Sequence, residues 1–208
     1  MGRRDTPPHV PPPRIVLGPD DIDATVARLA GELDEGHGDG TVLVGVLRGS
    51  VPFLADLVRA IGFHPRIDFV AVTAYTPGAG RVRLLKDLDL DVGGRDVVIV
   101  HDIVDTGLTS AFLVSEVERR HPRSVEICAL LDRSVRRVVP VPIAHVGLEV
   151  GDEYLVGYGL DHEGRYRNLH LVAAVDRAAL EADPDVYVPV LYGSVGGGDR
   201  SPEVDGPV

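Results

Sequence analysis

The sequence has a single cysteine, Cys128, among its 208 residues, and it has no tryptophan. A lone cysteine cannot form a disulfide within the chain, which excludes the disulfide-stapled class of small secreted domains. The sequence also lacks an apolar run of about 18 residues, and its amino terminus lacks the charged-then-apolar pattern of a secretion signal. We therefore expect a cytoplasmic protein that does not bind a membrane.

Basic residues are also in short supply. The chain has 21 Lys and Arg residues against 32 Asp and Glu, for a formal net charge of −11. Such a surface repels nucleic acid and anionic lipid, so we expect neither as a partner. An anionic substrate would therefore need a local binding feature, either a bound divalent cation or converging backbone N–H groups. With 44% hydrophobic residues, the chain is long enough to form the core of one α/β domain.

Both ends of the chain lack the apolar residues that a core requires. Five of the first 13 residues are proline, and residues 193–208 are rich in Gly, Pro, Asp and Ser. We expect disordered tails at 1–13 and 193–208, on either side of one domain at 14–180.

Apolar runs rich in β-branched residues alternate with helical patterns inside this domain. Ile22, Val26, Leu29, Ala30 and Leu33 recur at helical spacing before glycines that begin at Gly36. The patterns further predict strands at 42–47, 67–73, 97–100 and 125–131, and helices at about 51–61 and 108–120. This alternation predicts a doubly wound α/β fold, with a mainly parallel twisted sheet flanked by helices. The glycine-interrupted range 141–175 predicts a small flap of short strands and loops.

The segment 97–110, VVIVHDIVDTGLTS, carries the clearest chemical pattern. A hydrophobic strand leads into His101 and Asp102, and the chain then turns through Asp105, Thr106 and Gly107 into a helix. In open α/β sheets, ligands lie beyond the carboxyl ends of the strands, where a helix amino terminus offers free N–H groups to a phosphate. The turn lacks the lysine and spacing of a nucleotide triphosphate loop. From the residues alone, a phosphate site and an ordinary capped turn are equally good interpretations.

This segment resembles the motif that binds phosphoribosyl pyrophosphate (PRPP) in type I phosphoribosyltransferases. Four further blocks, at 43–58, 82–100, 129–134 and 152–172, are similar to the hypoxanthine-guanine phosphoribosyltransferases and occur in the family's order. The resemblance implies the type I fold, with a hood formed mainly by 141–175 together with the N-terminal segment. It also implies a glycosyltransferase of purine salvage that uses Mg²⁺ to transfer the 5-phosphoribosyl group of PRPP to hypoxanthine or guanine, releasing pyrophosphate. By analogy we expect a homodimer or homotetramer.

The resemblance assigns roles to the residues around the turn. In the family, the 5′-phosphate is held by the positions of Asp105, Thr106, Gly107, Leu108 and Thr109. The pair His101 and Asp102 falls in the ribose and metal region, where only Asp102 is a carboxylate. Asp105 is the implied catalytic residue, because the family places this carboxylate beside N7 of the base, where it takes up or relays a proton. An aspartate at this position could also be only a helix cap.

Other blocks imply the rest of the site. Arg48 and Gly49 match the pyrophosphate-binding loop, in which the family has a nonproline cis peptide bond, here expected between Leu47 and Arg48. Asp161 matches a carboxylate that ligates a second magnesium, so Asp102 and Asp161 are the implied metal ligands. Arg167 matches an arginine that binds pyrophosphate. Each charged residue alone could equally be a surface charge.

The implied base pocket combines Arg133, Tyr154 and Leu155, and Tyr75 belongs to the implied mobile loop that covers the site. Four features depart from the family pattern. His101 replaces a glutamate, Arg133 replaces a lysine that recognises the oxygen at purine C6, Ala74 replaces a serine, and the loop after Tyr75 is about three residues shorter. Arginine still donates to an oxygen, but as a planar fork of different reach, so the departures bear mainly on the choice of base.

Three alternatives stay open. An enzyme that uses the same PRPP machinery on a modified base, such as a deazapurine, would account for Arg133 and His101. A regulatory protein that senses PRPP or a nucleotide on the same fold would need a basic face, which the charge of −11 argues against. A transition-metal hydrolase site at His101, Asp102 and Asp105 lacks further histidines at ligand spacing, although the chain has eight.

Overall fold

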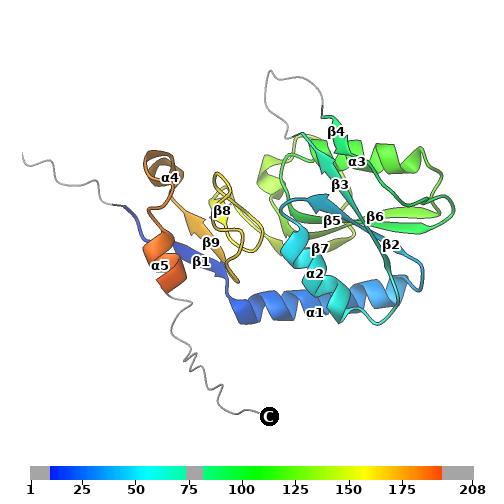
Figure 1. Cartoon of the computed structure of the whole chain (residues 1–208), viewed down its shortest axis with the longest axis horizontal. Helices are drawn as coiled ribbons and strands as arrows, with labels where there is room; N and C mark the ends of the chain where they lie inside the picture. Colours follow the sequence, from blue (N-terminus) through cyan, green and yellow to red (C-terminus); the bar gives the residue numbers. More distant parts are fainter. Residues whose placement is uncertain (1–9, 74–81, 194–208) are drawn as a thin grey trace, which may run out of the picture.

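A computed structural model describes residues 10–73 and 82–193 of the chain. Six strands form the main sheet in the order β4-β3-β2-β5-β6-β7 (Figure 1). Their bounds are β2 Val42–Leu47, β3 Arg66–Val72, β4 Leu84–Lys86, β5 Asp96–Val104, β6 Ser124–Asp132 and β7 His145–Glu149. All neighbouring pairs are parallel except β3 and the short edge strand β4. The predicted mainly parallel sheet is confirmed.

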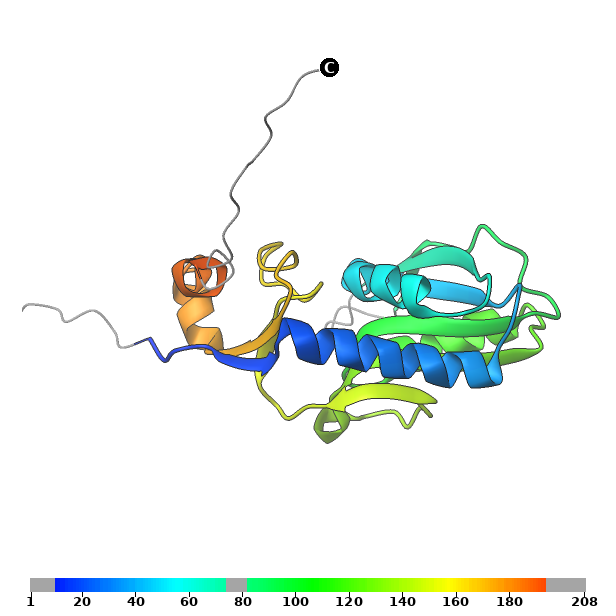
Figure 2. The same ribbon diagram turned by 90° about the horizontal axis from the view of Figure 1, so that it is seen from below.

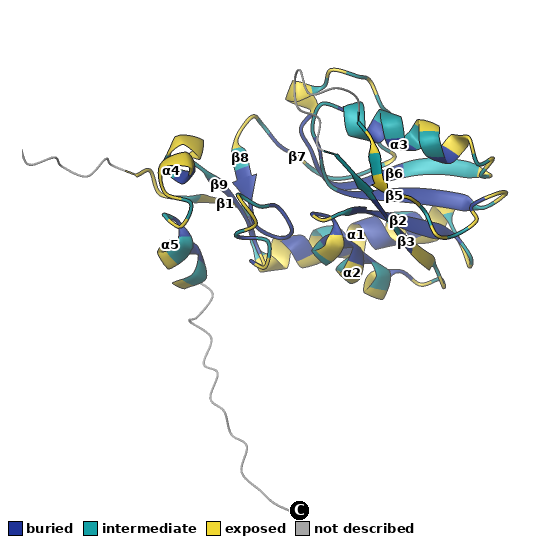
Figure 3. Cartoon of the chain, turned by 45° about the horizontal axis from the view of Figure 1, so that its top comes forward, coloured by how far each residue is buried: buried dark blue, intermediate teal, exposed yellow. Residues whose placement is uncertain are grey.

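Helices cover both faces of this sheet (Figures 1 and 2). Helices α1 (Pro19–Gly36) and α2 (Val51–Ala60) lie on one face, and α3 (Leu108–Glu118) lies on the other. Alternate side chains of each strand point to opposite faces, so Val98 of β5 packs with the first layer and Val97 with the second. The central strands are therefore buried on both sides, as Figure 3 shows for β2 and β5.

The apolar stripe of α1 is the one that the sequence predicts. Its five buried side chains are Ile22, Val26, Leu29, Ala30 and Leu33. At the start of the helix, the Asp21 side chain accepts a hydrogen bond from the backbone N–H of Gly18, at 2.9 Å. Burial of each large side chain contributes about 1.5–3 kcal/mol, so the stripe holds α1 against the sheet.

A second, antiparallel sheet of three strands, in the order β1-β9-β8, forms a hood beside the main sheet. It consists of β1 (Arg14–Leu17), β8 (Tyr154–Val156) and β9 (Val172–Val175). The range 141–175 is thus divided, because β7 pairs with β6 in the main sheet while β8 and β9 pair in the hood. The short helices α4 (Arg177–Ala182) and α5 (Val188–Gly193) complete the hood, where Tyr187 and Leu191 are buried.

Strand β5 is longer than the apolar pattern predicts. The expected strand ends at Val100, but pairing with β6 continues through His101 and Ala129 to Val104 and Asp132. The polar residues interrupt the apolar run without interrupting the hydrogen bonds of the ladder. Helices α2 and α3 and strands β2, β3 and β6 lie within two residues of their predicted bounds. In the described part of the chain, no helix combines the length and the apolarity needed to span a bilayer.

Candidate active site

The polar residues of the sequence blocks meet where three neighbouring strands end. Arg48 and Gly49 follow β2, Asp105 follows β5, and Arg133 follows β6. Because β2, β5 and β6 are parallel and adjacent, their carboxyl ends lie at the same edge of the sheet. The hood faces this edge. The fold therefore brings residues more than 80 positions apart to one place.

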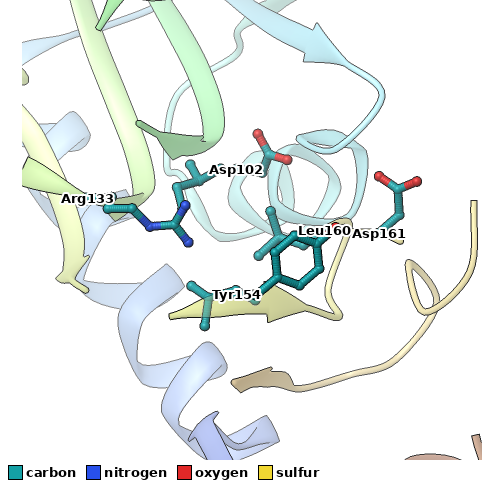
Figure 4. A pocket seen from close by; sticks show the side chains of 7 residues that line it. Asp102, Arg133, Tyr154, Leu160 and Asp161 are labelled. Atoms are coloured by element: carbon teal, nitrogen blue, oxygen red, sulfur yellow. The ribbon is translucent and has the colours of Figure 1, made fainter. Parts of the chain in front are cut away.

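A cavity of about 150 Å³ lies between this edge and the hood (Figure 4). Asp102, Ile103 and Arg133 line it from the main sheet, and Tyr154, Leu155, Leu160 and Asp161 line it from the hood. Four of the predicted base and metal residues thus share one cavity with Asp102. Figure 4 shows Arg133 and Asp102 facing Tyr154 and Asp161 across it.

Asp105 is held by two arginines. Its Oδ2 atom lies 3.4 Å from a terminal nitrogen of Arg133 and 3.8 Å from one of Arg136. Its other oxygen, Oδ1, is buried and has no hydrogen-bond partner among the described residues. The helix that follows has Gly107 as its N-cap and no side-chain cap, so capping does not account for Asp105. One oxygen of this carboxylate is therefore left to accept a hydrogen bond from a ligand.

Arg133 is buried at the back of the cavity by contacts with the main chain of the hood. Its Nε donates to the carbonyl of Gly151 at 3.1 Å, and one terminal nitrogen donates to the carbonyl of Glu153 at 2.7 Å. With the bond to Asp105, three of its five N–H groups are used. Two N–H groups are left for an acceptor in the cavity.

The carboxylate of Asp102 fits against the main chain of Gly49. A Cβ atom built on Gly49 would lie 1.6 Å from Asp102 Oδ2, so no other residue can take this position while Asp102 keeps its place. Burial raises the pKa of Asp102 to about 6, and the nearby Asp161 adds to the rise. Arg167 and two backbone N–H groups oppose it. A carboxylate in this position gains from a bound cation.

The loop after β2 also contacts the hood. The peptide bond between Leu47 and Arg48 is cis, as the resemblance implies. Gly159 of the hood has φ +99°, and a Cβ atom there would lie 1.9 Å from the carbonyl oxygen of Gly49. A hydrogen bond of 2.6 Å joins Arg167 to the carbonyl of Gly159, and an ion pair of 2.7 Å joins Arg167 to Asp161. Gly49 and Arg167, both predicted to bind pyrophosphate, thus lie against the same residue, Gly159.

The turn from β5 into α3 encloses a second cavity, of about 170 Å³. It is lined by His101, Asp102, Asp105, Thr106, Gly107, Thr109 and Ser110, among others. Gly107 has φ +82°, and the carbonyl of Thr106 accepts hydrogen bonds from Val138 and Val139 at 2.9 and 3.0 Å. The N–H of Leu108 makes a long contact of 3.5 Å with the hydroxyl of Thr106, and the N-cap Gly107 has no side chain to bind the N–H groups that follow. These groups can therefore bind an anion in this cavity.

His101 lines the same cavity, but its ring is buried. Its Nε2 atom lies 3.3 Å from the hydroxyl of Ser110 on α3. Burial lowers the pKa of His101 to about 4, so the ring is neutral at pH 7. His101 therefore brings no charge to the region where the family has a glutamate.

Tyr154 lies on the hood side with its hydroxyl 3.0 Å from Nδ1 of His162. The guanidinium carbon of Arg177 lies 5.6 Å from the centre of its ring. Leu155, the next residue of β8, is buried and pairs with Ala174 of β9. The hood strand thus holds both predicted base residues at the cavity.

Four residues that line or contact the site were not predicted from the sequence. Ile103 and Leu160 supply apolar lining, Arg136 reaches Asp105, and Ser110 meets His101. Ser110 is the last residue of the block at 97–110 and Arg136 lies two residues after the block at 129–134, and these positions are the signal that could have found them. The predicted loop residue Tyr75, with Ala74 before it, lies outside the described residues.

Comparison with known proteins agrees with this geometry. The family model for the phosphoribosyl transferase domain matches residues 19–163. The hypoxanthine-guanine phosphoribosyltransferase of Mycobacterium avium is 41% identical over 172 residues, which cover 78% of this chain and 85% of that protein. The hypoxanthine phosphoribosyltransferase of Escherichia coli K12 is 41% identical over 161 residues, which cover 74% and 90%.

Solved structures show the same relation. The crystal structure of a hypoxanthine-guanine phosphoribosyltransferase from Bacillus anthracis matches with a TM-score of 0.76 and 35% identity, covering 81% of this chain and all of that one. A hypoxanthine phosphoribosyltransferase from Staphylococcus aureus matches with a TM-score of 0.77 and 34% identity, covering 80% and 92%. With its cavity at the carboxyl ends of a parallel sheet and these relatives over most of its length, the chain belongs to the hypoxanthine-guanine phosphoribosyltransferase family.

Proposed function

We propose that this protein transfers the 5-phosphoribosyl group of PRPP to a 6-oxopurine, hypoxanthine or guanine, and releases pyrophosphate. The observation that carries the proposal is the cavity in which Asp102, Arg133, Tyr154 and Asp161 meet, with the turn that leads into α3 beside it. The cavity offers donors, a ring and carboxylates, and the turn offers N–H groups to a phosphate. Relatives named for this activity are 41% identical.

Asp105 is the proposed acid–base residue. When the base attacks the ribose through one ring nitrogen, it must lose a proton, and a carboxylate at hydrogen-bond distance can accept it. Oδ1 of Asp105 has no partner among the described residues, while Arg133 and Arg136 hold the other oxygen. The two arginines thus fix the position of the carboxylate and leave Oδ1 free to face the base.

Arg133 is the proposed recognition residue for the oxygen at purine C6. Its two remaining N–H groups can donate to a carbonyl oxygen, whereas the amino group of adenine would face them as a donor. Because Gly151, Glu153 and Asp105 hold the guanidinium, its donors have a fixed direction. This arrangement favours 6-oxopurines over adenine.

Asp102 and Asp161 would hold Mg²⁺ with oxygen atoms of PRPP. The residues fit this ion, because it prefers carboxylate and phosphate oxygens and keeps several waters. The raised pKa of Asp102 marks a buried carboxylate that a cation would stabilise. When bound, Mg²⁺ would neutralise charge on the pyrophosphate. Arg167 pairs with Asp161, and Asp102 lies against the space that a side chain at position 49 would fill.

The chain's own groups also bind the two ends of PRPP. The reaction breaks the bond between ribose C1 and the pyrophosphate oxygen, so negative charge develops on the leaving group and positive charge on the sugar. Arg48, Gly49 and Arg167 would bind the leaving group, and preorganised donors of this kind supply much of the rate in such reactions. The turn at 105–109 would hold the 5′-phosphate. The proposal of a homodimer or homotetramer rests on the family alone.

The test is release of pyrophosphate from PRPP in the presence of Mg²⁺, with hypoxanthine, guanine, xanthine, adenine and several deazapurines as acceptors. We expect turnover of hypoxanthine or guanine, with kcat lowered by about 10²–10⁴-fold in Asp105→Asn. Binding of PRPP to that variant, measured by calorimetry, serves as the control for an intact site. Arg133→Lys tests recognition of the base separately and should change KM for the base more than KM for PRPP.

Other outcomes would point to other functions. Turnover of a deazapurine alone would identify an enzyme for a modified base. PRPP binding without turnover of any base would contradict the proposal and favour a regulatory protein. Full activity in Asp105→Asn would refute the role of that carboxylate while leaving the transfer itself in place.

A further inference from the structure

Three side chains from three elements meet at the other end of the main sheet. His37 follows the last residue of α1, Glu126 lies near the start of β6, and His145 begins β7. Nε2 of His37 lies 3.2 Å from Oε2 of Glu126, and Nε2 of His145 lies 3.3 Å from the same oxygen. Among residues 10–73 and 82–193, this is the one group of His, Cys, Asp and Glu side chains with ligand atoms close enough to share a metal ion.

Two of the three separations match the edge of a tetrahedral metal site, and all three ligand atoms lie within 4.8 Å of one another. Zinc binds histidine nitrogen and carboxylate oxygen at about 2.0–2.1 Å. The edge of a tetrahedron with such bonds is roughly 3.3–3.4 Å, close to both measured separations. Two imidazoles and a carboxylate are also a ligand set that binds zinc and other transition metals.

A carboxylate orients His145 from behind. Its Nδ1 atom lies 3.0 Å from Oε2 of Glu32, and Arg28 pairs with the other oxygen of Glu32. A neutral ring that donates from Nδ1 to Glu32 turns the lone pair of Nε2 toward Glu126. Two acceptors then face each other at 3.3 Å, which a cation between them would relieve. Metal-binding histidines commonly have such a carboxylate on the second nitrogen.

The end of α1 favours a cation as well. The last turns of this helix carry Glu32, Asp34 and Glu35, and its final turn has no basic residue. The free carbonyls at a helix carboxyl terminus carry partial negative charge, so acidic residues there are unfavourable unless a cation compensates them. The side chain of His37 is only 3% exposed, while that of Glu126 is 38% exposed, which gives an ion a route from solvent.

We propose that His37, Glu126 and His145 form a binding site for a divalent transition metal of the zinc class, with Glu32 as the residue that orients His145. The site ties the end of α1 to β6 and β7. It is separate from the catalytic cavity, because it lies near the amino ends of the strands and the cavity lies at their carboxyl ends. Its role is to stabilise the main sheet. A water molecule would complete a tetrahedral shell of three protein ligands.

The experiment titrates the full chain, freed of metal by a chelator, with Co²⁺ and then Zn²⁺ in excess Mg²⁺. Magnesium occupies oxygen-ligand sites such as Asp102 and Asp161, while Co²⁺ in a tetrahedral nitrogen and oxygen site gives intense visible absorption. We expect one Co²⁺ per chain, displaced by Zn²⁺, and a rise in Tm with Zn²⁺.

Matched variants locate the site. Glu126→Gln keeps the shape of the side chain and should weaken zinc binding by roughly 100-fold or more, and Glu32→Gln by about 10–100-fold. The control is His64→Gln, because His64 also pairs with one carboxylate, Asp39 at 3.1 Å, but belongs to no such cluster. This control should bind zinc like the unchanged protein.

Circular dichroism checks the folding of each variant, and release of pyrophosphate should be unchanged in Glu126→Gln. Absence of stoichiometric Co²⁺ and Zn²⁺ binding to the unchanged chain would overturn the proposal. Equal affinity in Glu126→Gln and the unchanged chain would also overturn it. If Glu126→Gln does not fold, the milder Glu32→Gln decides in the same way.

Discussion

Replacing Gly107 by alanine tests how the turn before α3 is held. Gly107 has φ +82°, a conformation that costs a residue with a Cβ atom about 1–2 kcal/mol. The new Cβ atom would also lie 2.4 Å from the carbonyl oxygen of Val139 and 3.0 Å from Cδ of Arg137. Backbone atoms cannot give way as a flexible side chain can, so the segment 137–139 must move.

Movement of residues 137–139 would also weaken two hydrogen bonds. The N–H groups of Val138 and Val139 both donate to the carbonyl of Thr106, and each bond contributes about 1 kcal/mol. Together with the backbone conformation, we expect Gly107→Ala to lower the free energy of unfolding by about 2–4 kcal/mol. Gly94 is a matched control, because its φ is +67° and no atom lies within 4 Å of a Cβ built there. Gly94→Ala should cost only about 1–2 kcal/mol.

Urea unfolding followed by circular dichroism measures both losses, and release of pyrophosphate measures the functional effect. Because the proposed 5′-phosphate site is formed by this turn, Gly107→Ala should raise KM for PRPP, whereas Gly94→Ala should leave it unchanged. Equal destabilisation by the two variants would show that the contact with Val139 is not rigid. An unchanged KM in Gly107→Ala would argue against a phosphate site at the turn.

Three further predictions concern buried groups. Because burial raises the pKa of Asp102 to about 6, its ionisation opposes folding, and stability without Mg²⁺ should fall as the pH rises from about 4 to above 6. Asp102→Asn should remove this pH dependence and raise the free energy of unfolding of the metal-free protein at pH 7 by up to about 3 kcal/mol, as measured by urea unfolding. A variant less stable than the unchanged protein would refute the pKa shift. Cys128 is buried, and burial raises the pKa of its thiol. A thiol reagent such as Ellman's reagent should therefore react with it only at the rate of unfolding, and fast reaction in native buffer would contradict this. Leu191 is 1% exposed in the hood, and Leu191→Ala should cost about 2–5 kcal/mol, against little for the exposed control Val135→Ala; equal losses would mean that α5 does not support the fold.

Patterns within single segments were enough to predict most elements of the main sheet. The stripe of α1 and the strands β2, β3 and β6 can be predicted because each depends on the spacing of apolar residues within 20 positions. The pattern predicts β5 too short, since a strand in the middle of a sheet keeps its ladder through polar residues such as His101. It also could not assign β7 to the main sheet, because glycines and prolines surround this short strand.

For the candidate site, too, the residues within the motifs were predictable and their long-range partners were not. The resemblance of the blocks and of the motif at 97–110 was enough to predict five residues of the cavity, but not its apolar lining residues Ile103 and Leu160. The partners of these residues were not predictable. That Asp105 is held between Arg133 and Arg136, and that His101 faces Ser110, depends on how β5 and β6 lie beside each other and on α3 above them.

The histidines show the limit most clearly. The sequence has no further histidines at ligand spacing around His101. The fold, in contrast, brings together His37, Glu126 and His145, although Glu126 lies 89 residues after His37 and 19 residues before His145. Local periodicity predicted the doubly wound sheet, and the motifs predicted the family and the residues proposed for the site. The long-range pairs depend on the folded chain, because the order of the parallel strands and the packing of α1 bring together residues that no local pattern connects.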